Sequence, residues 1–254
     1  MSEQLLEERE GHIAVLTINR PERLNALSPE VLTALGDRLR QWAQEGEVRA
    51  VIIKGAGAKA FSAGYDIGRI GQTRGDPLRY GLEGVMNFPY PVIAAIRGFA
   101  IGAGLHLAMA CDLRIASPTA RFSMPPVRLG IVYPLEGYEL FVRTLGPSAA
   151  KALFLTGCHF GAQEALQMGL VHRVEPDEAL DEYVRALAHE LAEECAPLAV
   201  QGAKFIINRL ALGPLSPEDA AQARELMLRA FQSEDAKEAQ AAFAQKRKPQ
   251  FQGR

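Results

Sequence analysis

The chain has little cysteine and no excess of charge of one sign. Its 254 residues include three cysteines, Cys111, Cys158 and Cys195, which lie far apart and form no CxxC pair. An odd number of widely spaced cysteines argues against a disulfide framework or a zinc site and fits a reducing compartment. The 28 basic and 30 acidic residues give a net charge of −2. The sequence therefore offers no basic surface for nucleic acid or for an anionic membrane.

Long apolar runs are also missing. The longest stretch without a charged residue lies between Arg97 and Asp112, and it contains His106 and three glycines. It is too short to span a bilayer. The first ten residues, MSEQLLEERE, are acidic where a signal peptide would be basic and then apolar. We therefore expect a soluble, cytoplasmic protein that binds neither membrane nor nucleic acid.

Several motifs of common enzyme classes are absent. No GxxxxGK[ST] stands anywhere in the chain, and no GxGxxG opens a helix after the first predicted strand. The GxSxG turn of serine hydrolases and the HExxH pair of zinc proteases are missing as well. The sequence therefore argues against nucleotide phosphate transfer, dinucleotide binding, triad hydrolysis and zinc catalysis.

What is present is a pattern of alternating strands and helices. Apolar residues make up 48% of the chain and charged residues 23%, as in an ordinary globular protein. The alternation predicts an α/β fold with a mostly parallel sheet, in which residues 1–195 form the α/β core and residues 196–254 a helical C-terminal region. The expected strands are 12–19, 50–54, 91–96, 113–116, 121–124 and 171–174, and the expected helices are 29–44, 77–88, 105–110, 148–155, 162–168, 178–193, 198–211, 217–231 and 235–245.

Two glycine-rich turns each follow a predicted buried strand. They are FSAGYD at residues 61–66 and GFAIGAG at residues 98–104. A strand that runs through such a turn into a helix leaves backbone N–H groups directed at open space, with the partial positive charge of the helix start beside them. Two such turns side by side would direct two donors at one developing oxyanion. The alternative is that the glycines only allow a helix to pack closely on the sheet.

With their flanking residues, these turns resemble the crotonase superfamily, the enoyl-CoA hydratase/isomerase group. The resemblance covers nearly the whole chain. It implies a ββα spiral core, a helical C-terminal trimerisation region, an acyl-CoA substrate and assembly as a homotrimer or homohexamer. Its blocks are NRPERLNALS (19–28), FSAGYDI (61–67), PVIAAIRGFAIGAGLHLAMACDLRIAS (91–117), FSMPPVRLGI (122–131), ALFLTG (152–157), QEALQMGLVHRV (163–174) and AFAQKRKPQF (242–251).

The resemblance also assigns roles to individual residues. It implies that the backbone N–H groups of Tyr65 and Ala103 form the oxyanion hole, with alanine where the family more often has glycine. No cofactor is implied beyond the coenzyme A that arrives as part of the substrate. The residues implied to line the coenzyme A channel are Leu24, Ala26, Ala63, Asp66 and Ile67, and the tail residues Lys246, Arg247 and Lys248 match the region that reaches the phosphates, although a solvated terminus explains those charges equally well.

Two catalytic positions depart from the family pattern. A family hydratase uses two glutamates, which hold and activate a water molecule between them. This sequence has His106 at the first of those positions and Pro126 at the second. Histidine can act as a base, but proline moves no proton. Direct hydration of an enoyl-CoA is therefore disfavoured, and His106 is either a base or a packed polar residue beside the pocket.

Decarboxylation of a malonyl thioester needs no general base, because the electrons of the departing carbon dioxide flow into the thioester carbonyl. Several segments, including FSAGYDI, DPLRY (76–80) and FSMPPVRLGIVYPLEG (122–137), resemble the methylmalonyl-CoA decarboxylase branch. That branch places a functional tyrosine at Tyr133, whereas its histidine in the first turn is replaced here by Tyr65. Decarboxylation of methylmalonyl-CoA or a similar short malonyl thioester is the preferred expectation.

Two other functions stay open. Glu136 and Glu139 lie at the start of a predicted helix, where an isomerase or hydratase would use Glu136 or His106 to move a proton. Favourable charge at a helix start explains both glutamates as well. The remaining alternative is a non-catalytic acyl-CoA binding subunit, since both family glutamates are absent.

Overall fold

The computed structural model describes residues 3–66, 68 and 75–254. Two sheets form its centre, the larger in the order β1-β2-β3-β5-β7-β10 and the smaller in the order β4-β6-β8-β9. Neighbours in the larger sheet are parallel except β1 and β2, which confirms the expected α/β fold. The strands are β1 Leu5–Glu10, β2 Ile13–Ile18, β3 Ala50–Gly55, β4 Ala60–Ser62, β5 Val92–Ile96, β6 Phe99–Ile101, β7 Leu113–Ala116, β8 Arg121–Ser123, β9 Phe160–Gly161 and β10 Arg173–Val174.

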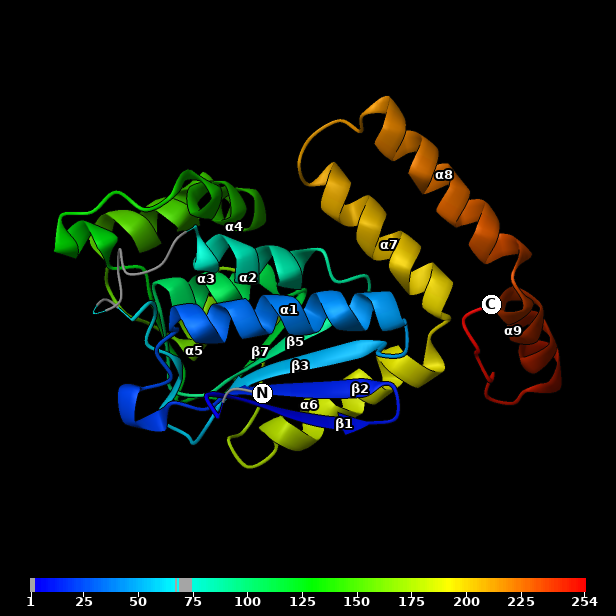
Figure 1. Cartoon of the computed structure of the whole chain (residues 1–254), viewed down its shortest axis with the longest axis horizontal. Helices are drawn as coiled ribbons and strands as arrows, with labels where there is room; N and C mark the ends of the chain where they lie inside the picture. The colour runs from blue at the N-terminus through cyan, green and yellow to red at the C-terminus, as the bar shows by residue number, and fades with distance from the viewer. Residues whose placement is uncertain (1–2, 67, 69–74) are drawn as a thin grey trace.

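Helices cover both faces of the larger sheet (Figure 1). Alternate residues of β2 and β3 enter different cores, Leu16 and Ile53 the one with α1, and Val15 and Ile52 the one with α6. This alternation is the period of a strand buried on both faces. The helices are α1 Pro29–Glu45, α2 Pro77–Met86, α3 Ala103–Ala110, α4 Leu135–Thr156, α5 Ala162–Gln167, α6 Leu180–His189, α7 Pro197–Leu210, α8 Pro217–Gln232 and α9 Glu234–Gln245; shorter turns are η1 Pro21–Arg23, η3 Pro126–Leu129 and the π-helical η4 Glu190–Glu194.

Helix α1 illustrates how local sequence sets an element. The Ser28 hydroxyl accepts a hydrogen bond from the Val31 N–H at 3.3 Å, and Pro29 occupies the first turn. The helix ends at Gly46, which has a left-handed φ of 71°. The apolar side chains expected on one face are buried in the structure; they are Val31, Leu32, Leu35, Leu39 and Trp42.

Four strands were missing from the sequence prediction. The first, β1, reads LLEERE and buries only Leu5, so it carries no apolar alternation. It pairs antiparallel with β2 at the sheet edge, where charged side chains protect the open backbone from pairing with other strands. The other three, β4, β6 and β9, have two or three residues each, too few to show a period.

The last three helices project away from the sheets (Figure 1). Lys204 of α7 reaches back to the core, where its ammonium group lies 2.6 Å from an Asp112 carboxylate oxygen and donates to the Tyr90 carbonyl at 2.8 Å. The division of the chain at residue 195 stays a prediction, and α7 begins two residues later. Among the described residues, no helix is both long and apolar enough to cross a membrane.

Candidate active site

The first glycine-rich segment, FSAGYD, begins within β4, and the turn that follows this strand is bonded to the loop after β2. The Leu27 N–H donates to the Gly64 carbonyl at 2.7 Å, and the Asp66 N–H donates to the Leu27 carbonyl at 2.9 Å. A trans peptide holds its C=O and N–H in opposite directions. Because the Gly64 carbonyl points at Leu27, the Tyr65 N–H of the same peptide points away from that loop.

The second turn joins β6 to α3. Gly102 has a φ of 54°, a conformation that favours glycine. Its carbonyl accepts the N–H of His106 at 2.9 Å, the first bond of the helix. By the same trans geometry, the Ala103 N–H points outward from the helix start. The N–H groups of the first helical turn have no partner within the helix, so this donor is directed away from it.

The structure brings these two turns into contact. A Cβ atom added to Gly64, whose φ is 104°, would lie 2.8 Å from the Ile101 carbonyl oxygen and 3.5 Å from the Ala103 nitrogen. A Cβ atom on Gly104 would lie 2.4 Å from the Ser62 carbonyl oxygen. The glycines therefore do allow close packing, as the alternative interpretation held, and that packing places the Tyr65 and Ala103 peptides next to each other.

Behind the second turn, His106 and Tyr133 form a hydrogen-bonded pair. His106 is three residues beyond Ala103, and its Nδ1 lies 3.2 Å from the Tyr133 hydroxyl. Their ring centroids are 5.6 Å apart, and the Phe141 ring lies 6.1 Å from the imidazole. A Cβ atom on Gly137 would lie 2.5 Å from the Tyr133 ring and 3.4 Å from His106 Cε1, so only glycine fits between α4 and the pair.

Burial keeps both members of this pair uncharged. His106 is 4% exposed, and desolvation lowers its pKa from 6.5 to about 4, opposed by the negative charge of Glu136. Burial raises the pKa of the Tyr133 hydroxyl above its ordinary value. At neutral pH the site thus holds a neutral imidazole and a neutral phenol in contact, with one carboxylate near enough to favour a positive charge on the imidazole.

The other candidate acid–base positions differ in exposure. Glu136 and Glu139 lie in the first two turns of α4 and are both exposed, and Glu139 pairs with Arg143 at 3.7 Å. Of these two glutamates, Glu136 is the one whose negative charge raises the pKa of His106. Pro126 is buried and opens η3, so the structure has no proton-carrying side chain at this position. His106 is thus a buried member of a pair, which agrees with both interpretations of that residue.

The predicted coenzyme A channel residues fall into two groups. Leu24, Ala26, Ala63 and Asp66 lie together, because the Ala63 N–H donates to the Leu24 carbonyl at 2.9 Å and Asp66 is bonded to the same loop. Leu24 is exposed and has a left-handed φ of 51°. Ile67 lies outside the described residues. The binding role of these residues stays a prediction.

The tail lysines do not join that group within one chain. Lys246 ends α9 with a left-handed φ of 54°, and Lys248 pairs with Glu194 at 2.6 Å. Helix α9 lies at the far end of the molecule from α3 and η1 (Figure 1). The binding role of Lys246 and Lys248 stays a prediction.

Sequence reasoning missed two residues that shape this region. Gly137 leaves room for the His106–Tyr133 pair, and it is the last residue of the FSMPPVRLGIVYPLEG block, which was the available signal. Arg20 donates to the Ala26 carbonyl at 2.7 Å and to an Asp66 carboxylate oxygen at 2.9 Å. It lies within the NRPERLNALS block, which was the available signal. Among the described residues, no cluster of three side chains could hold a metal ion.

This fold and paired-turn site define a crotonase-type α/β protein, and comparison with known proteins agrees. A family model described as enoyl-CoA hydratase/isomerase matches residues 8–254. The chain therefore belongs to this family and is an acyl-CoA enzyme of the crotonase superfamily.

Similar proteins cover nearly the same length. The short-chain-enoyl-CoA hydratase of Clostridium acetobutylicum is 40% identical over 251 residues, which is 95% of this chain and 94% of that protein. The 2,3-dehydroadipyl-CoA hydratase of Escherichia coli K12 is 36% identical over 256 residues, 99% of each chain. The crystal structure of an enoyl-CoA hydratase/carnithine racemase from Magnetospirillum magneticum matches with a TM-score of 0.92 and 34% identity, over 100% of this chain and 97% of that one.

Proposed function

We propose that this chain moves a proton between carbons of a short enoyl-CoA, as an enzyme of the enoyl-CoA hydratase/isomerase type, through a thioester enolate. The observation that carries the proposal is the 3.2 Å contact between His106 Nδ1 and the Tyr133 hydroxyl, beside the turn that bears Ala103. The family description, enoyl-CoA hydratase/isomerase, includes this reaction, and the two relatives named above are hydratases; both support an enoyl-CoA reaction over decarboxylation, our expectation from the sequence alone.

The proposed reaction is a double-bond migration that conserves atoms. The Tyr133 oxygen takes the α-proton while its own proton passes to His106 Nδ1, which requires the imidazole tautomer with its proton on Nε2. The electron pair of the broken C–H bond forms the enolate, whose oxygen accepts the N–H groups of Tyr65 and Ala103. While the enolate is held, the pair exchanges its protons with solvent, and Tyr133 then delivers a proton to the γ-carbon, where the electron pair of the dienolate forms the new C–H bond.

Glu136 supports this relay through its charge. The low pKa of His106 makes the imidazolium costly, and the carboxylate of Glu136 offsets part of that cost. Hydration is less well supported than migration, because Pro126 leaves an attacking water without the second carboxylate that the family hydratases use. One base is enough for a proton that leaves one carbon and returns to another.

Decarboxylation is the second candidate, and the lack of a carboxylate at position 126 favours it. In that reaction Tyr133 would donate a hydrogen bond to the substrate carboxylate, and after carbon dioxide leaves it would pass its proton to carbon and regain one from solvent. The buried, low-charge surroundings of the pair suit a carboxylate that must lose its solvation. The two candidates share the oxyanion hole and differ in their products.

A parallel turnover assay tests the proposal. A 3-enoyl-CoA, crotonyl-CoA and methylmalonyl-CoA are offered separately, and products are identified by mass spectrometry and NMR. We expect migration of the double bond, and Tyr133→Phe should lower its rate by about 100-fold or more. Tyr138→Phe is the matched control, because Tyr138 lies on α4 close to Tyr133 in the sequence, and both rings pack on Phe154, with ring centroids 4.5 Å away for Tyr138 and 6.0 Å away for Tyr133.

The possible products separate the alternatives. Release of carbon dioxide from methylmalonyl-CoA, with both enoyl thioesters unchanged, would replace the proposal by decarboxylation. Tight binding of every thioester without turnover would instead favour the non-catalytic binder.

We also propose a homotrimer or homohexamer in the cytoplasm. Large apolar side chains on the projecting helices α7 to α9 are exposed in the single chain, which supports burial against other copies. Ile207, Phe231 and Phe243 are examples. Analytical ultracentrifugation tests this, and a monomer at micromolar concentration would contradict it.

A further inference from the structure

The contact between the first turn and the loop after β2 determines the direction of one oxyanion-hole donor. Three backbone hydrogen bonds join the two segments, from Ala63 to Leu24, from Leu27 to Gly64 and from Asp66 to Leu27, with lengths of 2.7 to 2.9 Å. The middle bond holds the peptide whose other end is the Tyr65 N–H. Any sliding of the loop against the turn therefore rotates that N–H.

Arg20 links both sides of this contact. One guanidinium nitrogen donates to the Ala26 carbonyl at 2.7 Å, on the loop, and the other donates to an Asp66 carboxylate oxygen at 2.9 Å, on the turn. The side chains of Arg20 and Asp66 are only 12% and 17% exposed, so solvent weakens the ion pair less than at an open surface. The planar fork of arginine suits this double contact, whereas lysine offers a single point charge.

The backbone around Arg20 is itself held in place. The Asn25 side-chain oxygen accepts the Arg20 N–H at 3.0 Å, and its amide donates to the carbonyls of Ala56 and Ala60 at 3.0 and 2.7 Å. Asn25 is 1% exposed and has a left-handed φ of 55°, which asparagine tolerates better than most residues. Arg20 thus extends from an anchored backbone to a carboxylate next to Tyr65.

We propose that Arg20 is a positioning residue for the oxyanion hole, acting through Ala26 and Asp66 on the direction of the Tyr65 N–H. The proposal rests on the oxyanion hole of the proposed function. Arg20 touches the turn from the side of the loop, so its removal loosens the direction of one donor while the Ala103 N–H, held by α3, is unchanged. Stabilisation of the enolate falls, because a preorganised donor loses its effect when misdirected.

The test compares Arg20→Gln and Arg20→Lys with the parent chain. Bound crotonyl-CoA labelled with ¹³C at the thioester carbonyl is examined by isotope-edited infrared spectroscopy, since hydrogen bonds to this oxygen lower its stretching frequency. Its dissociation constant is measured by calorimetry, and turnover is measured on the active substrate. We expect Arg20→Gln to lower kcat by about 10- to 100-fold and to reduce the frequency shift. The dissociation constant of crotonyl-CoA should change by less than about threefold. The kcat and the frequency shift of Arg20→Lys should lie between those of the parent chain and those of Arg20→Gln.

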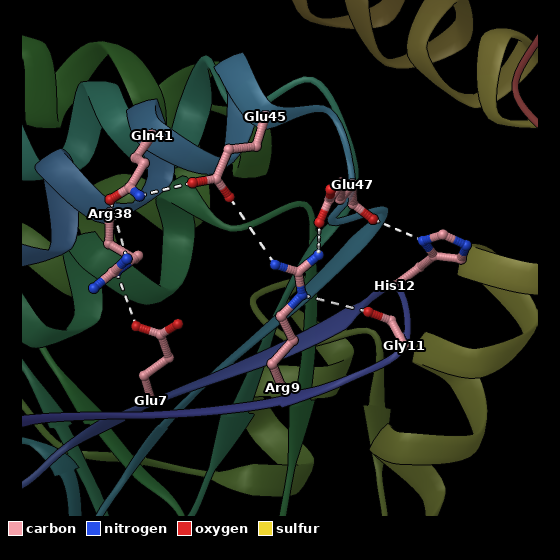
Figure 2. A network of polar contacts seen from close by, with 8 residues as sticks. All are labelled: Glu7, Arg9, Gly11, His12, Arg38, Gln41, Glu45 and Glu47. Carbon is pink, nitrogen blue, oxygen red and sulfur yellow. Dashed lines mark hydrogen bonds and ion pairs between the residues drawn. The ribbon is translucent and has the colours of Figure 1, made fainter.

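The ion pair between Arg38 and Glu7 supplies a matched control. Its N···O distance is also 2.9 Å, and its side chains are 22% and 17% exposed. It joins α1 to β1 on the side of the molecule drawn in Figure 2, in a network with Arg9 and Glu47 that includes neither glycine turn. Arg38→Gln should remove an ion pair of similar burial without changing the carbonyl frequency or kcat.

Each outcome has a separate meaning. If the parent chain gives no downward shift of the carbonyl frequency, the oxyanion hole itself is absent and the proposed function fails. If the parent gives the shift and Arg20→Gln keeps both the shift and kcat, Arg20 has no positioning role. If Arg20→Gln and Arg38→Gln lower kcat and the melting temperature by equal amounts, the effect is a general loss of stability, which also overturns the positioning role.

Discussion

Replacement of His106 by glutamine should remove a pH-dependent contribution to stability. The imidazole is 4% exposed, and its pKa falls from 6.5 to about 4 in the folded chain because burial disfavours its charged form. A difference of this size between the folded and unfolded states corresponds to about 3 kcal/mol of unfolding free energy.

The sign follows from which state binds the proton. Between pH 6.5 and about 4 the unfolded chain protonates this histidine and the folded chain does not. The unfolding free energy therefore decreases as pH falls through this interval. Above pH 6.5 both states are neutral and below about 4 both are charged, so the contribution from His106 is constant on either side.

Urea denaturation at a series of pH values from 4 to 7.5 measures this effect. Carboxylates titrate in the same range, so the informative quantity is the difference between the parent and His106→Gln at each pH. That difference should change by about 3 kcal/mol across the interval. His189→Gln, which replaces an exposed histidine at the end of α6, serves as the control. A difference that stays constant from pH 7.5 to 4 would refute a buried, neutral His106.

Three further predictions concern neighbouring parts of the fold. Gly64→Ala should abolish turnover while the chain still folds, because its Cβ would lie 2.8 Å from the Ile101 carbonyl oxygen at a φ of 104°; full activity in a steady-state assay would contradict the paired turns. Lys204→Met should lower the unfolding free energy by about 3 kcal/mol, since it leaves the Asp112 carboxylate unpaired beside the core, and adding Asp112→Asn should recover part of the loss in the same denaturation assay. Ser28→Ala should cost about 1 kcal/mol through loss of the α1 cap, and an unchanged urea midpoint would show that the cap contributes nothing.

The elements that were predicted well from the sequence combine capping residues with an apolar period that fits only one type of secondary structure. Helix α1 carries a serine–proline start and five apolar residues on one face, and its observed span differs from the expected one by a single residue. The predicted helix over 148–155 is the second half of α4, which bends at Gly146, where φ is 75°, before Pro147. Its first half, which carries Gly137 and Phe141, was expected only as a helix start at Glu136, because glycine and proline interrupt its pattern.

The candidate site shows where sequence reasoning stops. The sequence places Tyr65 and Ala103 in two glycine-rich turns but misses β4 and β6, the short strands that lead into them, and packing alone then brings the two turns together. The contact between His106 and Tyr133 spans 27 residues and depends on how α4 lies over α3. No local pattern encodes such a distance. The link from Arg20 to Asp66 spans 46 residues and was missed for the same reason.

The most direct test of the account measures the incorporation of solvent deuterium into carbon. The chain is incubated in heavy water with a 3-enoyl-CoA, and the recovered thioesters are analysed by mass spectrometry and NMR for deuterium at the α- and γ-carbons. The account predicts deuterium at these carbons with the parent chain and with Tyr138→Phe, and about 100-fold slower incorporation with Tyr133→Phe or His106→Gln. Incorporation at the parent rate in both of the latter variants, or none in the parent, would contradict proton transfer by the His106–Tyr133 pair.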